Sequence, residues 1–266
     1  MHPIERLRFV ARASGVDHGL LVRETAGALA SLGFDPAGLV TACRRVLDRH
    51  PTSGPLWWLA TRVLTAHEPT REAWRCADEI DEDRTALELV YALPQDARVC
   101  VLGWPELVGE ALARRGDLEV LVVDVLGEGR GLVRRLQRAD VDAVEVPPAG
   151  LGAAAASADV VLLEASALGA DGAVAVAGSH AAAAVGAHAE VPVWVVAGVG
   201  RALPEGTWRA LVARLDADEP WEADDELVPL DLLTGVVGPS GVADAAAVLA
   251  EAAQLVEAPE LFRPAL

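Results

Sequence analysis

Lysine is absent from this chain, because all 22 basic residues of the 266 are arginines. The absence excludes Schiff-base chemistry on a lysine, a lysine general base and the lysine of a Walker-type phosphate loop. A site for an anion therefore has to use arginine side chains, backbone N–H groups or the N-termini of helices.

Cysteines and long apolar runs are also scarce. The three cysteines, Cys43, Cys76 and Cys100, are odd in number and irregularly spaced, which argues against a disulfide framework or a zinc site. The longest stretch without formal charge, residues 172–189, is too weakly apolar for a membrane span. The first ten residues mix charges with apolar residues, unlike a signal peptide. We expect a cytoplasmic protein that holds neither a metal nor a cofactor.

The charge is strongly one-sided, with a formal net value of −18. A negative field disfavours nucleic-acid backbones and anionic membranes as partners, since both bind basic patches. A solvated acidic surface is the simplest explanation of this charge. The hydrophobic fraction of 52% indicates a folded globular protein.

Residues 1–92 are predicted to form a helical N-terminal domain. Leucines and other apolar residues recur at helical spacing, with breaks around residues 34–36 and 50–55. Trp57 and Trp58 lie inside an apolar helical run, which favours a place in the core over a ligand cage. Residues 72–93 are predicted to form one longer helix with an acidic, solvated face.

Residues 93–266 are predicted to form a Rossmann-like, mostly parallel, doubly wound sheet domain. Short apolar runs alternate with helix-length segments, as expected for strands that helices cover on both faces. The overall fold class is therefore α/β. The predicted strands contain the runs RVCVLGW, EVLVVDV, DAVEV, DVVLLEA, VPVWVVAG and LLTGVVG.

Residues 159–198 are the most informative segment, predicted as a strand, a small-residue loop, an alanine-rich helix and a second strand. Such a loop lies at the carboxyl end of the sheet, where open α/β folds bind ligands. The free N–H groups at the start of the helix can hold a phosphate. Within this segment the candidate ligand residues are Ser166, Asp171, Gly178, Ser179 and His180.

Two further segments could contribute to the same crevice. Residues 127–131 read Gly-Glu-Gly-Arg-Gly, where Arg130 could clamp an anion, although a flexible turn before a helix is an equally good interpretation. Their spacing is not that of the dinucleotide fingerprint. Gly103 ends the first sheet strand, and Glu106 begins the next helix with an ordinary stabilising role.

The order of these pieces resembles the translation initiation factor 2B alpha/beta/delta family, which includes methylthioribose-1-phosphate and ribose-1,5-bisphosphate isomerases. The similarity covers nearly the whole chain. It implies a helical N-terminal domain, a Rossmann-like C-terminal domain and a homodimer built through the latter. The residues that carry it are 50–53 with the following helix, 101–104, 164–168, Asp171-Gly172, Gly178-Ser179, 191–197 and 232–240.

The departures from the family concern its chemistry. The resemblance places the isomerases' cysteine and aspartate on Gly103 and Ser166, while Cys100 lies three residues too early. Neither glycine nor an unassisted serine can shuttle a proton near neutral pH. One of the family's phosphate-contacting arginines falls on His50 and the other near Leu126, with Arg130 close enough to replace it.

We therefore expect the ends of the first and fourth sheet strands to face one cleft that lacks a proton-shuttling pair. The leading hypothesis is a non-catalytic, regulatory binder of a phosphorylated sugar or nucleotide. One alternative is a sugar-phosphate isomerase with relocated groups, with Asp171 or Glu164 as base and His180 or Cys100 as acid. A purely structural interaction subunit is the other. The predicted ligand-binding residues are His50, Thr52, Gly103, Arg130, Ser166, Asp171, Gly178, Ser179 and His180.

Overall fold

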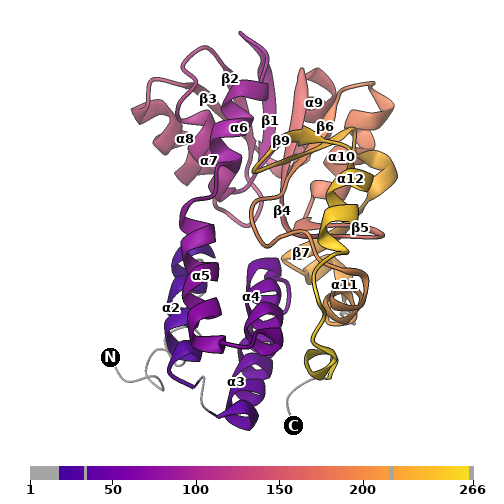
Figure 1. Cartoon of the computed structure of the whole chain (residues 1–266). Helices are drawn as coiled ribbons and strands as arrows, with labels where there is room; N and C mark the ends of the chain where they lie inside the picture. The colour runs from indigo at the N-terminus through magenta and orange to yellow at the C-terminus, as the bar shows by residue number, and fades with distance from the viewer. Residues whose placement is uncertain (1–17, 33–34, 216–218, 264–266) are drawn as a thin grey trace.

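The computed structural model describes residues 18–32, 35–215 and 219–263. Within the described residues, the N-terminal part contains the helices α2 (His18–Ala30), α3 (Pro36–Arg49), α4 (Gly54–Thr65) and α5 (Pro69–Asp81), which lie together below the sheet in Figure 1. Proline stands in the first turn of α3, α4 and α5, where no N–H partner is lost. Trp57 and Trp58 are buried in the core of this part, as predicted.

The prediction of a single helix over residues 72–93 is wrong, because the helix is interrupted at residues 82–84. The next helix, α6 (Thr85–Ala92), begins after Arg84, and Thr85 N donates to Asp83 Oδ1 at 2.8 Å just before it. Asp83 Oδ2 accepts from Val199 N at 2.9 Å, so this carboxylate also binds a distant loop. Ala86 and Leu89 of α6 are buried with residues of the sheet and its helices, although the predicted boundary placed them in the N-terminal domain.

The rest of the described chain is built on a nine-stranded sheet, in which seven strands follow the order β3-β2-β1-β4-β6-β8-β9 and two more extend from β4. The seven strands of this order are β1 (Arg98–Leu102), β2 (Glu119–Val123), β3 (Asp142–Val146), β4 (Val160–Gly169), β6 (Val193–Val196), β8 (Gly235–Gly238) and β9 (Gly241–Ala243). Every pair along this order is parallel except β8–β9. The predicted α/β class with a mostly parallel sheet is confirmed.

Helices cover both faces of this sheet (Figure 1). Apolar side chains of α6, α7 (Glu106–Leu112) and α8 (Gly129–Arg138) are buried in one core with residues of β1 and β2. Those of α9 (Leu151–Ser157), α10 (Ser179–His188) and α12 (Ala245–Ala252) pack in a second core against β4 and β6. The sheet is therefore doubly wound, as its strand pattern predicted.

The small-residue loop predicted after β4 is wrong, because its residues form strands. β4 continues to Gly169 and turns at Ala170-Asp171 into β5 (Gly172–Val176). β5 pairs in turn with β7 (Asp225–Pro229), a strand that lies far along the chain. The β4–β5 and β5–β7 pairs are both antiparallel. Alanine, valine and glycine suit a loop, a helix or a strand, so only the long-range pairing with β7 decides between them.

The remaining elements are short. They are α11 (Glu205–Val212) and the 3₁₀ turns η1 (Pro148–Gly150), η2 (Pro220–Glu222), η3 (Leu230–Leu232) and η4 (Pro259–Phe262). All three cysteines are buried free thiols. No helix in the described part of the chain has the length and apolar character needed to cross a membrane.

Candidate functional site

A pocket of about 630 Å³ opens at the carboxyl ends of β1 and β4. The chain runs outward from β1 to β3 and then returns to β4 beside β1, so this is the point where strand order reverses. Open α/β folds bind ligands at such a point. Leu102 and Trp104 lie on the β1 side and Glu164 and Ser166 on the β4 side, so the two strand ends share one cleft as expected.

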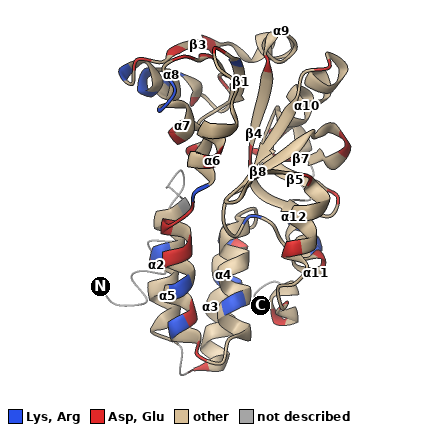
Figure 2. Cartoon of the chain, turned by 45° about the horizontal axis from the view of Figure 1, so that its top comes forward, with Lys and Arg blue, Asp and Glu red and all other residues tan. Residues whose placement is uncertain are grey.

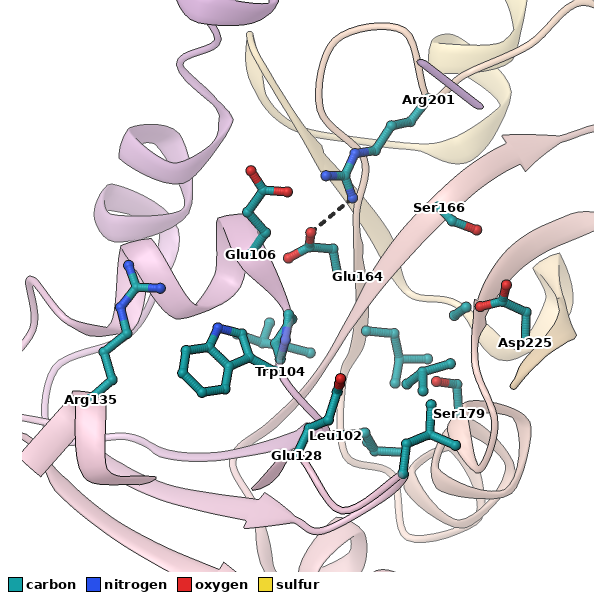
Figure 3. A pocket seen from close by; sticks show the side chains of 16 residues that line it. Leu102, Trp104, Glu106, Glu128, Arg135, Glu164, Ser166, Ser179, Arg201 and Asp225 are labelled. Carbon is teal, nitrogen blue, oxygen red and sulfur yellow. Dashed lines mark hydrogen bonds and ion pairs between the residues drawn. The ribbon is translucent and has the colours of Figure 1, made fainter. Parts of the chain in front are cut away.

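The polar lining of the pocket comes from seven segments of the chain (Figure 3). It comprises four carboxylates, two guanidinium groups and two hydroxyls: Glu106, Glu128, Glu164, Asp225, Arg135, Arg201, Ser166 and Ser179. Despite the carboxylates, no group of three or more potential ligands in the described residues is arranged to hold a metal ion. The pocket can hydrogen-bond a small polar molecule in several directions.

Ser179, at the first position of α10, lies at one end of the pocket. Gly178 before it adopts a left-handed backbone with φ +94°, which glycine permits without strain. Ser179 is 1% exposed and its Oγ has no hydrogen-bond partner. The neighbouring His180 N donates to Glu226 Oε1 at 2.8 Å. A buried hydroxyl without a partner is costly, which marks this end of the pocket as a place for a ligand atom.

A buried ion pair between Glu164 and Arg201 forms another part of the wall. Arg201 Nη1 donates to Glu164 Oε1 at 2.9 Å and to Ala165 O at 2.6 Å. Glu164 Oε2 accepts from Val108 N at 3.0 Å, so both of its oxygens are occupied. The Arg201 side chain is 4% exposed and that of Glu164 is 10% exposed. Glu164 is held as a paired carboxylate, which is a poor arrangement for the general base considered from the sequence.

Asp225, at the start of β7, places a half-buried carboxylate in the same pocket. Burial raises its pKa above the ordinary aspartate range, and a hydrogen bond with the Thr52 side chain partly opposes that rise. Thr52 lies between α3 and α4 and does not line the pocket. It contacts the pocket residue Asp225 through this hydrogen bond. The sequence predicted a role for Thr52 but not for its partner.

The structure brings together some of the predicted ligand residues. Ser166 and Ser179 line the pocket, and Gly178 caps the helix that carries Ser179. The Ser166 hydroxyl donates to Val174 O at 3.2 Å, which leaves it an acceptor for a ligand. Gly103, with φ +63°, lies beside the lining, since a Cβ built there would lie 4.0 Å from Glu128 Oε2.

Other predicted residues lie outside the pocket lining. Asp171 is exposed at the β4–β5 turn, and the side chain of His180 is exposed on α10. Arg130 is exposed and its Nε lies 3.1 Å from Glu145 Oε2, away from the crevice. His50 is the C-cap residue of α3 and is absent from the lining. Any role of these four in binding remains a prediction that the pocket geometry does not favour.

Cys100 is buried within β1 and does not line the pocket. Burial in an apolar core raises the pKa of its thiol to about 12. A thiol of this kind neither ionises near neutral pH nor reaches a ligand, so the geometry does not favour Cys100 as a catalytic acid.

Sequence reasoning missed Trp104 as a lining residue, together with Glu128, Arg135, Arg201 and Asp225. Arg135 lies on the same helix as the predicted Arg130, five residues later, and it is Arg135 that lines the pocket. Arg201 lies after β6 and Asp225 begins β7, and their approach to the pocket depends on pairings that no local pattern reveals.

Comparison of the structure with solved structures decides the fold. Translation initiation factor eIF-2B from Pyrococcus horikoshii OT3 superposes with a TM-score of 0.75 at 16% identity, over 91% of this chain and 96% of that one. This chain has the fold of the eIF2B subunits. The beta subunit from Chaetomium thermophilum gives a TM-score of 0.76 at 15% identity, over 97% and 92% of the two chains.

The tetrameric eIF2B-beta2-delta2 complex from C. thermophilum gives a TM-score of 0.75 at 17% identity, over 96% of this chain and 94% of that chain. By sequence alone, no family model and no curated protein matches. The fold of these subunits is therefore adopted by a sequence that is only 15–17% identical to theirs.

Proposed function

We propose that this eIF2B-like chain is a non-catalytic binder of a phosphorylated sugar or nucleotide, with a regulatory role. The observation that carries the proposal is the Ser179 hydroxyl, buried without a partner at the start of α10 in the pocket wall. A phosphate oxygen would satisfy this hydroxyl, and the partial positive charge of the helix N-terminus would favour the anion. The bond from His180 N to Glu226 uses only one of the N–H groups in this turn.

The charges in the pocket suit a ligand with hydroxyl groups as well as a phosphate. Glu128 and Asp225 can accept hydrogen bonds from sugar hydroxyls, because ionised carboxylates are acceptors only. Arg135 supplies a guanidinium for which no ion pair is present in the described structure. A phosphorylated polyol would therefore meet donors at its phosphate and acceptors along its carbon chain.

The non-catalytic part of the proposal rests on the positions where the family resemblance places its chemistry. Gly103 offers no side chain, and the Ser166 hydroxyl is bonded to a backbone carbonyl without a basic partner in the described structure. Glu164 is held by Arg201 and Val108 N. None of these groups can take and return a proton between sugar carbons near neutral pH.

Titration of the purified chain with ribose 5-phosphate and with adenosine 5′-monophosphate tests the binding. We expect at least one of them to bind, and at about 100 times its dissociation constant to add ~2.7 kcal/mol of stability. Ser179→Ala should weaken binding roughly tenfold, since a hydrogen bond to a charged group is lost. Ser157→Ala, on the exposed end of α9, is the matched control. Absence of binding by both compounds would leave the structural interaction subunit as the better description.

Asp225 favours a second candidate function, an aldose–ketose isomerase with a relocated proton carrier. Its raised pKa and its place in the pocket are the properties of a general acid–base group. Incubation with aldose phosphates would then produce ketose phosphates, and Asp225→Asn would abolish this turnover. Turnover at the uncatalysed rate in the unmodified protein excludes this candidate.

We also propose that the chain forms a homodimer through its sheet domain. The support is the resemblance to the family and the tetrameric assembly of a protein with this fold. Native mass spectrometry of the purified chain measures the assembly directly, and a monomer at micromolar concentration would contradict the proposal.

A further inference from the structure

Helix α8 concentrates positive charge on an otherwise acidic molecule, as the blue ribbon of this helix shows in Figure 2. Arg130, Arg134 and Arg138 are all exposed and stand four residues apart, so they form one stripe along the helix, the arginine stripe. Arg130 Nε lies 3.1 Å from Glu145 Oε2. No ion pair of Arg134 or Arg138 is present in the described structure, so most of the stripe can bind an external carboxylate.

Residues 219–226, the acidic segment, form a surface of opposite charge. They read Glu-Pro-Trp-Glu-Ala-Asp-Asp-Glu, with five carboxylates and no basic residue. Two of the carboxylates are used internally, because Asp225 lines the pocket and Glu226 accepts from His180 N. The three exposed carboxylates are those of Glu219, Glu222 and Asp224.

The acidic segment also displays a tryptophan, because Trp221 is 77% exposed. Tryptophan and arginine are enriched at the energetic centres of protein interfaces, where an indole and a guanidinium group can stack. The chain already makes this contact internally, since Arg62 stacks on Trp58 at 4.7 Å from the ring centroid. Arg214 stacks on Trp57 at 4.6 Å in the same way. An exposed indole among carboxylates is therefore suited to an arginine-rich surface.

The two surfaces lie on either side of the same pocket. Arg135, the neighbour of Arg134 on α8, and Asp225, the neighbour of the exposed carboxylates, line opposite sides of it in Figure 3. Trp221 is four residues before Asp225, and four residues span at most about 14 Å. A two-fold axis near the pocket opening can therefore bring each surface of one copy against the other surface of a second copy. Such a contact occurs twice and closes as a dimer.

Charge decides between the possible arrangements of two copies. Each copy carries a formal charge of −18, so two copies repel one another overall and need a locally complementary contact. Two acidic segments that face each other would oppose like charges, and so would two arginine stripes. The arrangement that opposes unlike charges pairs the stripe of one copy with the acidic segment of the other.

We propose that two copies of this chain associate through a reciprocal contact, in which the arginine stripe of each copy binds the acidic segment of the other. A guanidinium group of the stripe would stack on Trp221, and its neighbours would bind the exposed carboxylates. This inference rests on the proposed homodimer and names the surfaces that form it.

Charge reversal of each surface tests the contact. We expect Arg134→Glu with Arg138→Glu, and separately Glu219→Arg with Glu222→Arg, to raise the dissociation constant of the dimer at least about 100-fold, because each puts like charges together. Trp221→Ser should raise it at least about 30-fold, as expected for an interface tryptophan. Sedimentation velocity of the full chain at micromolar concentration measures the association, and circular dichroism establishes that each variant is folded.

Mixing the two charge-reversed proteins provides the decisive measurement. In a mixed dimer, one contact has both charges reversed and the other has both charges unchanged, so both contacts are again attractive. We expect the mixture to form a heterodimer, which native mass spectrometry distinguishes from either homodimer by mass. Two folded monomeric variants that fail to pair would overturn the reciprocal contact.

Arg71→Glu with Arg209→Glu is the matched control. It makes the same change in net charge as the reversal on α8, and these side chains are 85% and 72% exposed on other helices. We expect its dimer to be as stable as that of the unmodified chain.

The remaining outcomes separate this inference from the proposed homodimer. A dimer that both charge reversals leave intact would overturn the contact and leave the homodimer in place through another face. A monomeric unmodified chain would overturn both. Oligomers that grow beyond a dimer would overturn the two-fold closure, since the same contact would then be made head to tail.

Discussion

The pocket wall contains both a buried ion pair and a buried hydroxyl without a hydrogen-bond partner. Arg201 and Glu164 satisfy one another through a buried ion pair. Ser179 beside the same cavity leaves its hydroxyl unsatisfied. The Arg201–Glu164 ion pair stabilises the wall, and the Ser179 hydroxyl is available to a ligand in the pocket.

Breaking the ion pair should cost more than removing both of its partners. Arg201→Met leaves the Glu164 carboxylate buried with only the Val108 N–H, and we expect a loss of about 3–5 kcal/mol in the free energy of unfolding. The double variant Glu164→Leu with Arg201→Met should recover much of this loss. Urea denaturation measures all three proteins. A single variant as stable as the unmodified protein would contradict the burial of the pair.

Asp225 should make stability depend on pH in one direction. Because burial raises its pKa in the folded protein, ionisation opposes folding. The contribution of Asp225 to the free energy of unfolding is fully present below the ordinary aspartate pKa of about 4. It is lost as the pH rises through the higher pKa of Asp225 in the folded protein. Asp225→Asn keeps an acceptor for Thr52 without this charge, so it should gain stability over the unmodified protein at pH 7 and not at pH 4. Urea denaturation at the two pH values decides the matter, and an equal difference at both would contradict this explanation.

At the level of elements, the sequence predicted the parallel strands and missed the antiparallel ones. Short apolar runs rich in β-branched residues, such as RVCVL and EVLVV, are typical of buried strands, so β1 and β2 were predicted where they lie. The alanine and valine residues of β5 carry no comparable preference, and β7 supplies its pairing from far along the chain. Ser166 was predicted in the loop after a strand and Ser179 at the start of the alanine-rich helix, and both line the pocket, whereas Asp225 belongs to β7 and was not predicted.

The helix break at residues 82–84 has a similar explanation. Acidic residues suit a solvated helix face, and nothing local shows that Asp83 instead binds Thr85 and the distant Val199 N. The same limit applies to Arg201, whose partner Glu164 lies 37 residues earlier. Local periodicity identifies elements, but contacts between distant loops depend on the assembled fold.

Two glycines in different elements should respond oppositely to alanine. In Gly169, at the end of β4, a Cβ would lie 2.0 Å from the Trp208 ring, so Gly169→Ala should cost about 1–3 kcal/mol. In Gly152, on α9, a Cβ would meet nothing within 4 Å, so Gly152→Ala should add about 0.5–1 kcal/mol. Chemical denaturation of the two variants gives both values. Equal effects of the same sign would contradict the packing at Trp208.

For the whole molecule, the net charge of −18 should make stability depend on salt. Like charges repel more in the compact folded state than in the expanded chain, and salt screens this repulsion. We expect the midpoint of thermal unfolding to rise as NaCl is increased from about 0.1 to 1 M, over which the Debye length falls from about 10 to 3 Å. Circular dichroism melting curves provide the measurement, and a midpoint that falls with added NaCl would show that attractive ion pairs dominate.

The carboxylates that produce this charge are spread over the helices and the sheet (Figure 2). The arginines are more locally gathered, with four of them on the ten residues of α8. The acidic residues therefore occur on many elements of the described chain.

The junction between α4 and β4 has a mechanical consequence. Gly54 lies so close to the strand that a Cβ there would be 2.6 Å from the carbonyl oxygen of Ser166, a residue of the pocket wall. Backbone rests on backbone at this point, with no side chain between them to take up a shift. A displacement of the wall at Ser166 would therefore displace the first turn of α4. Trp57 and Trp58, which pack in the core of the N-terminal helices, would transmit that displacement to them.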